Sequence, residues 1–215
     1  NEERAKLALL LSIALDKNYV DKTDFNVLQP AIDYYEDNGS ATEKFQTYYL
    51  QGRIYQNQGN DTQAMIAYAQ AKELLGGIDN HYLSGQLHTE IGNIYRSNYD
   101  YAKSLEAYKT AYDHYTAVGL ESYAAYALLD IGLSYWNLED NANGIEYINE
   151  ALQMALKLQD EYLEIAKGEF LWKGSVHGFL TYSVSNAYVA NGTVKRIQDA
   201  LKIAKEQMKE LSEAY

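Results

Sequence analysis

Glu90 and Asp130 are the two residues whose types and spacing come nearest to a catalytic pair. They lie forty residues apart, at the same position of two similar segments. Carboxylates about 5–9 Å apart can act in a glycoside hydrolase, and neighbouring packed helices lie about 8–10 Å apart. The simpler interpretation is that each carboxylate pairs with an arginine such as Arg53 or Arg96. Because no acid-tuning or sugar-stacking residues accompany the pair, we expect arginine pairing and no enzyme, with the hydrolase as the remote alternative.

Residues that bind metals or cofactors are not arranged as a site. His81 and His88 are two helical turns apart, about 10 Å along a helix axis, which is too far to share a zinc ion. The sequence contains no cysteine, which excludes disulfides and thiolate ligands. It also contains no glycine-rich phosphate loop, nucleophile elbow or EF-hand pattern. We therefore expect neither a metal nor a cofactor.

The composition excludes two further classes of partner. Apolar residues make up 47% of the 215 residues and charged residues 22%, as in globular proteins. The 18 basic and 30 acidic residues give a net charge of −12. A surface for nucleic acid is basic, so we expect no direct nucleic acid binding. The apolar residues 7–15 are about half of the ~20 needed to cross a bilayer, so we expect no membrane span.

The elements that position these residues follow a period of forty. Each copy has a glycine, a tyrosine three residues later, and then a small, a large and a small residue at fixed spacing. The members are Gly52, Gly92 and Gly132; Tyr55, Tyr95 and Tyr135; Ala64, Ser104 and Gly144; Tyr68, Tyr108 and Ile148; and Ala71, Ala111 and Ala151. Forty residues earlier the frame continues at Ser12, Leu15, Leu28 and Ala31. Such self-similarity is the signature of a repeat architecture.

Each repeat predicts a pair of helices. Apolar and small residues recur at three- and four-residue steps, and polar breaks at 57–61, 98–100 and 138–141 separate the two helices. Asp61 and Asp140 are placed to cap the second helices. The small residue of the first helix should face the large residue of the second. The predicted core tyrosines are Tyr55, Tyr68, Tyr95, Tyr108 and Tyr135.

We predict a single domain over residues 1–215 with about five helical hairpins. The regular repeats cover approximately residues 5–38, 45–78, 85–118 and 125–158. The signature then returns at Ser185, which is 53 residues after Gly132 instead of forty. We expect the 13 additional residues in an elongated helix or a kinked connection, within an irregular last repeat and capping helix over 160–215.

The pattern resembles the tetratricopeptide repeat over roughly residues 5–158. The resemblance implies an all-α, right-handed superhelix of antiparallel helix pairs. The sequence departs from the family in places, since Tyr48, His88 and Leu128 replace the usual tryptophan and the period is forty where the family has 34. Long-helix variants of this kind are typical of bacterial regulatory members.

The resemblance also implies a non-catalytic module that binds a protein or peptide in a concave groove lined by the first helices. The candidate binding residues are Tyr49, Arg53, Asn57, Glu90, Asn93, Arg96, Asp130, Leu133, Trp136 and Asn137. Arginine and asparagine can hold peptide carbonyls or a carboxylate, and Trp136 with Leu133 can seat an apolar side chain. A groove that is merely solvated, or covered by other parts of the protein, is the alternative.

Chaperone C-terminal tails are a disfavoured ligand. The carboxylate-clamp subclass of the family grips such tails with lysines and asparagines at defined groove positions. Those positions here hold Tyr49, Arg53, Glu90, Tyr126 and Asp130. The clamp is therefore not reproduced.

A second resemblance is to bacterial envelope-anchored tetratricopeptide proteins. It is carried by residues 16–19, 31–35 and 48–55. It implies a lipid anchor outside this sequence, a place on the periplasmic side of the cell envelope, and a sensory, regulatory or scaffold role. A peptide-pheromone receptor domain of a transcriptional regulator is the alternative. Because Leu7 to Leu15 leave almost no polar face, we also expect a homodimer or an N-terminal segment to cover this helix.

Overall fold

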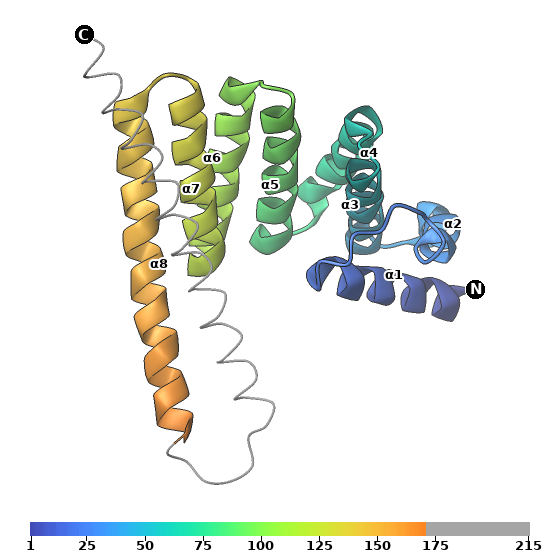
Figure 1. The fold of residues 1–215 in the computed structure, drawn as a ribbon. Helices are drawn as coiled ribbons and strands as arrows, with labels where there is room; N and C mark the ends of the chain where they lie inside the picture. Colours follow the sequence, from blue (N-terminus) through green and yellow to red (C-terminus); the bar gives the residue numbers. More distant parts are fainter. Residues whose placement is uncertain (171–215) are drawn as a thin grey trace. The chain divides into compact units, whose positions relative to one another are not determined.

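The computed structural model is all-helical over the part of the chain that it describes (Figure 1). It describes the backbone of residues 1–170 and the side chains of residues 1–158. The helices are α1 (Glu2–Lys17), α2 (Gln29–Asn38), α3 (Ala41–Asn57), α4 (Asp61–Leu74), α5 (His81–Ser97), α6 (Tyr101–Ala117), α7 (Glu121–Asn137) and α8 (Asn141–Phe170), with a 3-10 turn at Leu75–Gly77. The all-α class is confirmed, and the predicted fifth hairpin and capping helix lie outside the described residues.

The chain divides into two compact units, Asn1–Asn98 and Tyr99–Tyr215. In the first unit α1 packs against α2, α3 against α4, and α5 against α4. In the second unit α7 packs against both α6 and α8. The prediction of a single domain over all 215 residues stays a prediction.

Side-chain caps fix where the helices begin. The capping side chains are Ser40 for α3, Asn60 for α4, Asn80 for α5, Asp100 for α6 and Asp140 for α8. The predicted cap at Asp140 is confirmed, because its Oδ1 accepts from the Asn143 amide at 3.3 Å. The predicted cap at Asp61 is wrong, because Asn60 takes that place and Asp61 is the first residue of α4. The Asp61 carboxylate instead accepts hydrogen bonds from Ser97 Oγ at 3.2 Å and Asn98 Nδ2 at 2.6 Å.

The predicted contact between a small and a large residue is confirmed in two repeats. A Cβ added to Gly52 would lie 2.2 Å from a ring carbon of Tyr68, and one added to Gly132 would lie 2.6 Å from Ile148 Cγ1. Both distances are far inside van der Waals contact. Only glycine therefore allows the two helices of each pair to approach this closely.

The tyrosine predictions are right for the second helices and wrong for the first. Tyr68 and Tyr108 are fully buried, whereas Tyr55, Tyr95 and Tyr135 are only half-buried. The first-helix tyrosines lie in the last turns of their helices. In these turns the preceding residue, and not the tyrosine, lies on the face that packs against the neighbouring helix. Tyr55 covers the ring of Phe25 at 5.0 Å between centroids, and Tyr135 stacks on Tyr147 at 5.3 Å.

The second helix of the first repeat begins late. By the period of forty, α2 should start near Asp21, as α4 starts at Asp61, but it starts at Gln29. Pro30 stands in its first turn, where its ring and missing N–H oppose helix on its N-terminal side. The segment 18–28 is therefore non-helical. Leu28 and Ala31 nevertheless occupy their predicted buried positions, at 1% and 0% exposure.

The outer face of α1 is exposed in the described chain. Ala5, Ala8 and Leu9 are buried at helical spacing, which places one face of α1 on the core. Leu7, Leu10 and Leu11 lie on the other face and are 68%, 55% and 47% exposed. Within the described chain nothing covers these three leucines, and a homodimer or an N-terminal segment that covers them stays a prediction.

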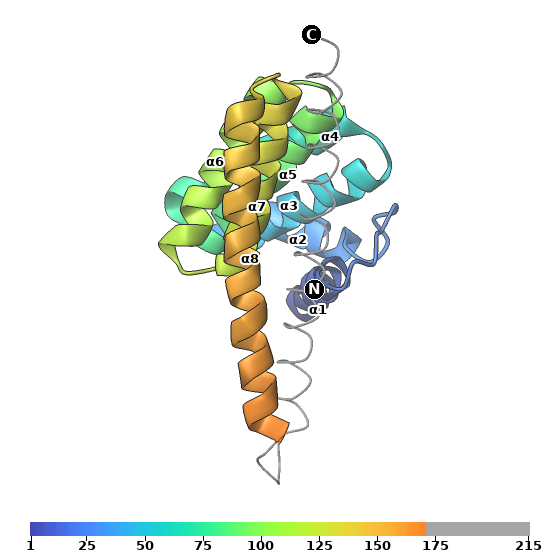
Figure 2. The same cartoon turned by 60° about the vertical axis from the view of Figure 1, so that its left-hand side comes forward.

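The last described helix runs past the predicted end of the fourth repeat. α8 continues to Phe170, twelve residues beyond the expected boundary at 158. Figure 2 shows it extending well past the ends of α6 and α7. Glycines follow α4 and α6, but no glycine, proline or asparagine occurs between residues 151 and 167. Without a stop signal, a run of strong helix formers continues as helix.

Candidate binding face of the first unit

Arg53 on α3 joins the three first helices of the first unit through ion pairs. Its Nε donates to Asp16 Oδ1 on α1 at 2.9 Å, and its Nη1 donates to Glu90 Oε2 on α5 at 3.0 Å. The three side chains are between 14% and 20% exposed. Asp16, Arg53 and Glu90 follow one another at 37 residues, one helical turn less than the repeat. These three residues, the Arg53 ladder, hold neighbouring first helices together.

Arg53 stays cationic over the physiological range. Burial lowers the pKa of the Arg53 guanidinium, but the charge of Glu90, with Tyr49 and Asp16, outweighs burial and raises this pKa overall. Burial, and after it the charge of Glu90, raises the pKa of Tyr49 and of Tyr68 well above the usual value. The neighbouring phenols therefore remain neutral while Arg53 remains cationic.

Four of the predicted site residues come together on this face. Asn93 Nδ2 donates to Glu90 Oε2 at 3.1 Å, and Arg96 Nη2 donates to Asn93 Oδ1 at 3.2 Å. The chain of contacts thus runs from Arg53 through Glu90 and Asn93 to Arg96. The interpretation that Glu90 pairs with an arginine is confirmed.

Two other predicted site residues have structural roles. Tyr49 is 8% exposed and stacks on Phe45, with 6.3 Å between ring centroids. Asn57 Nδ2 donates to the backbone carbonyl of Lys22 at 3.1 Å and so holds the non-helical segment 18–28 against α3. Besides these contacts, each of the two side chains lines a hollow of the first unit.

The remaining predicted site residues lie on α7 in the second unit. Asp130 is 8% exposed, Leu133 and Trp136 are half-buried, and Asn137 is exposed. Leu133 packs against the core of the second unit, and Asn137 Nδ2 bonds the Leu133 carbonyl at 2.7 Å. Because Glu90 belongs to the first unit and Asp130 to the second, their pairing as catalytic carboxylates stays an untested hypothesis.

A hollow lies beside the Arg53 ladder, between α1, α3 and α5. It is lined by Ile13, Asp16, Lys17, Phe45, Gln46, Tyr49, Leu50, Tyr82, Leu83 and Gln86, and it holds about 410 Å³ of empty space, part of it open to solvent. Apolar side chains form most of its lining, and Gln46 and Gln86 contribute two amides. Lys17 Nζ lies 5.6 Å from the centroid of the Tyr82 ring. We call this feature the glutamine hollow.

The two glutamines of this hollow were not among the residues predicted to bind a ligand. Gln46 and Gln86 are forty residues apart and occupy one repeat position. An amide repeated at one position of two first helices was the signal that could have identified them. Tyr126 stands at this position of the next repeat.

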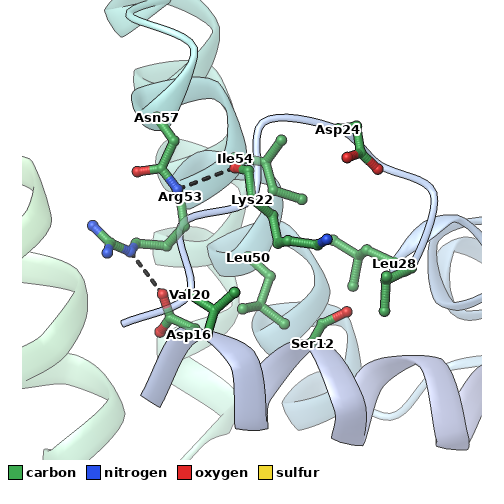
Figure 3. A pocket seen from close by; sticks show the side chains of 11 residues that line it. Ser12, Asp16, Val20, Lys22, Asp24, Leu28, Leu50, Arg53, Ile54 and Asn57 are labelled. Atoms are coloured by element: carbon green, nitrogen blue, oxygen red, sulfur yellow. Dashed lines mark hydrogen bonds and ion pairs between the residues drawn. The ribbon is translucent and has the colours of Figure 1, made fainter. Parts of the chain in front are cut away.

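A second hollow lies between α1, the segment 18–28 and α3 (Figure 3). Its lining combines five aliphatic residues with six polar ones, which are Ser12, Asp16, Lys22, Asp24, Arg53 and Asn57. It holds about 340 Å³ of empty space, part of it open to solvent. We call it the serine pocket.

Within the described residues, no group of three or more His, Asp or Glu side chains is placed to hold a metal ion. Over the same range, no helix combines the length and the apolar character needed to span a membrane.

Two segments match a known family. Residues 45–74 and 125–157 match the model of the tetratricopeptide repeat. They correspond to the α3–α4 pair and to α7 with the first part of α8. No curated protein matches the chain in sequence.

Solved structures share the fold at low sequence identity. BtubC (BKLC) from P. vanneervenii is 14% identical with a TM-score of 0.59, covering 97% of this chain and 80% of that one. A putative kinesin light chain from Podosopora anserina, with nearly identical TPR-like repeats, is 15% identical with a TM-score of 0.59, covering 98% and 99%. Identities this low show the fold alone, and the fold is a tetratricopeptide-like helical solenoid.

Proposed function

From the tetratricopeptide repeats that this chain carries, we propose that it is a non-catalytic protein- or peptide-binding module. Repeats of this kind generally mediate protein–protein interactions. The proposed binding face comprises the glutamine hollow and the Arg53 ladder beside it. A sensory, regulatory or scaffold role in a bacterial protein is the setting that we propose for the module.

The glutamine hollow is the observation that carries this proposal. It combines an apolar floor, from residues such as Ile13 and Phe45, with the amides of Gln46 and Gln86. An apolar floor provides affinity for a side chain, while amides can both donate to and accept from a peptide backbone. The hollow is therefore suited to an apolar side chain and its adjoining peptide groups.

The Arg53 ladder supports a neutral rather than a carboxylate anchor. Arg53 already donates to two carboxylates, Asp16 and Glu90. A ligand carboxylate would have to displace one of them and leave it half-buried without its partner. A C-terminal carboxylate is thus an unsuitable ligand for this face.

The test is capture by crosslinking in the source cell with a variant of the hollow. Gln46→Ala together with Gln86→Ala removes both amides from the hollow. The matched control is Gln63→Ala together with Gln70→Ala, which alters two exposed glutamines of α4. We expect the parent and the control to capture the same protein and the hollow variant to lose it, with circular dichroism confirming that all three fold. Equal capture by all three would contradict the glutamine hollow as the binding site.

A further inference from the structure

The first repeat changes three positions that pack together in the second. Where the second repeat has Gly52, Gln56 and Tyr68, the first has Ser12, Asp16 and Leu28, each forty residues earlier. The serine pocket lies among these three replacements. Leucine ends short of the space that the outer part of a tyrosine ring fills, so the pocket follows from the sequence of this repeat.

In the second repeat, a hydrogen-bond donor and an acceptor pair at the equivalent positions. Tyr68 Oη donates a hydrogen bond to Gln56 Oε1 at 2.9 Å. In the first repeat the acceptor is the carboxylate of Asp16, and Leu28 brings no donor. A carboxylate in place of an amide favours a donor that carries positive charge.

Acceptors without donors face this pocket. Ser12 is 7% exposed, and its Oγ is buried with no hydrogen-bond partner in the described part of the chain. Asp16 uses Oδ1 to accept from Arg53, and among the described residues its Oδ2 has no hydrogen bond. Asn57 uses its amide nitrogen on the Lys22 carbonyl, which leaves its Oδ1 as a further acceptor.

The charges around the pocket favour a cation. Asp16, Asp24 and Glu90 contribute three negative charges in or beside the pocket, against two positive charges from Arg53 and Lys22. Arg53 is bound on both sides by carboxylates. Figure 3 shows the Lys22 side chain extending across the pocket toward Leu28. The Lys22 side chain, a primary ammonium group on an aliphatic chain, thus already occupies this site. The acidic and aliphatic residues of the lining suit a group of this kind.

We propose that the serine pocket binds a primary ammonium group on a short aliphatic chain. The ammonium donates to Asp16 and to the other acceptors of the lining, and the chain lies against Val20, Leu28 and Leu50. The ligand displaces the Lys22 side chain, which competes for the same space. The serine pocket shares Asp16 and Leu50 with the glutamine hollow, but Ser12 and Lys22 line the serine pocket alone, so changes at these two residues test this proposal separately from the protein-binding function.

Two sources supply this chemistry, a free alkylamine or a lysine side chain of another protein. The experiment is a titration of the full chain with n-butylamine in one arm and a short capped lysine peptide in the other. Binding is followed by the methyl NMR signals of Val20, Leu28 and Leu50. Butyltrimethylammonium, which has the charge but no N–H donor, is the control ligand. A response in either arm, absent with the control ligand, supports the site, and the responding arm identifies the source.

Four variants locate the site. Asp16→Asn should weaken amine binding about tenfold, as loss of a charged hydrogen bond does. Asp37→Asn, the same change on the exposed face of α2, should leave binding unchanged. Ser12→Ala should weaken binding, and Lys22→Met should strengthen it by removing the competing ammonium. The last two keep the test decisive if Asp16→Asn does not fold.

The proposal is overturned by any of three results. One is the absence of methyl shifts with both amine ligands. Another is binding of butyltrimethylammonium as tightly as n-butylamine. The third is unchanged amine binding in folded Ser12→Ala and Lys22→Met.

Discussion

At the scale of single residues, the close packing of the helix pairs depends on glycines, which have no side chain. The first helices meet the second helices through Gly52 and Gly132, which leave room for a tyrosine ring and an isoleucine. Gly144 lets the backbones of the same two helices approach each other, because a Cβ added to it would lie 3.2 Å from the Gly132 carbonyl oxygen. These three glycines thus set the close approach of the helices in two of the pairs.

Gly132→Ala should destabilise the protein by about 2 kcal/mol, in the range for overpacked cores. The added methyl group would lie 2.6 Å from Ile148 Cγ1 and 2.9 Å from the Gly144 carbonyl, so α7 and α8 must move apart. The free energy of unfolding in urea measures the effect. Gly76→Ala is the control, since its Cβ meets nothing within 4 Å. If both variants unfold alike, the close approach of α7 and α8 is wrong.

Tyr68→Phe should cost about 1 kcal/mol, because it removes one buried hydrogen bond and leaves the ring in place. The lost bond is the one from Tyr68 Oη to Gln56 Oε1 at 2.9 Å. Tyr99→Phe, at a position 78% exposed, should have no measurable effect. The comparison of the two melting temperatures tests whether the phenol of Tyr68 has the buried acceptor described above.

The cap of α3 should make stability depend on pH. Hydrogen bonds from Ser40 lower the pKa of Glu43 below its usual value. A lowered carboxyl pKa stabilises the fold above the unfolded pKa of about 4.3, and this stabilisation is lost as pH falls through the folded pKa. Ser40→Ala should therefore cost about 1 kcal/mol at about pH 5.5 and less at about pH 3.5.

Asn80→Ala is the matched control for this pH dependence. Asn80 caps α5, and the third residue of that helix is Leu83, which cannot titrate. Its cost in unfolding free energy should be the same at both pH values. A cost of Ser40→Ala that is also independent of pH would show that Glu43 does not take part in the cap.

At the scale of elements, the segment 18–28 is the part of the fold that departs most from the repeat. It follows the forty-residue register at Leu28 but is not helical before Gln29. Two side chains of α3 hold it, Asn57 on the Lys22 carbonyl and Gln58 on the Thr23 carbonyl at 2.8 Å. The irregular backbone of this segment forms one wall of the serine pocket.

Asn57→Ala should loosen this segment without unfolding the unit. We expect amide hydrogen exchange of residues 20–28 to accelerate about fivefold, the result of losing about 1 kcal/mol from one hydrogen bond. Asn137→Ala is the control at the same repeat position, because the Asn137 side chain bonds a carbonyl of its own helix. Unchanged exchange in Asn57→Ala would mean that other contacts hold the segment.

The sequence could predict the elements that repeat but not those that break the repeat. Gly52, Tyr68 and Ala71 recur at fixed spacing, so their helix pair and its contact were predictable from one chain. The late start of α2 depends on Pro30 alone, and the length of α8 depends on a stop signal that is missing. A single residue or a missing residue type has no periodic signal, which is why neither boundary could be read from the repeat.

The candidate site was only partly predictable for a related reason. Arg53, Glu90, Asn93 and Arg96 were identified from their repeat positions, and the structure brings them together. It brings them together by bonding them to one another, and such pairing depends on rotamers that the sequence does not specify. Tyr49 was also expected on the groove; it lines the glutamine hollow but is only 8% exposed, because its ring packs against Phe45 and Tyr68.

At the scale of the whole molecule, the chain consists of two compact units. The units meet in sequence between Asn98 and Tyr99. In a solenoid each repeat is stabilised mainly by its neighbours, so a local loss of stability spreads only a short distance. The Arg53 ladder lies wholly within the first unit.

Arg53→Met should therefore weaken one unit and spare the other. It leaves Asp16 and Glu90 half-buried without their common partner, which should cost about 2 kcal/mol. We expect faster amide hydrogen exchange in α1, α3 and α5 and unchanged exchange in α7. Equal acceleration in α7 would show that the chain unfolds as one cooperative body.

The length of α8 has a mechanical consequence. With 30 residues it is about 45 Å long, whereas the 17 residues of α7 reach about 25 Å. A rod of this length amplifies small rotations, so a tilt of about 10° at its base moves its far end by about 8 Å. The second unit thus contains a lever arm, through which a small strain near Gly132 becomes a displacement large enough to be measured between two spectroscopic labels.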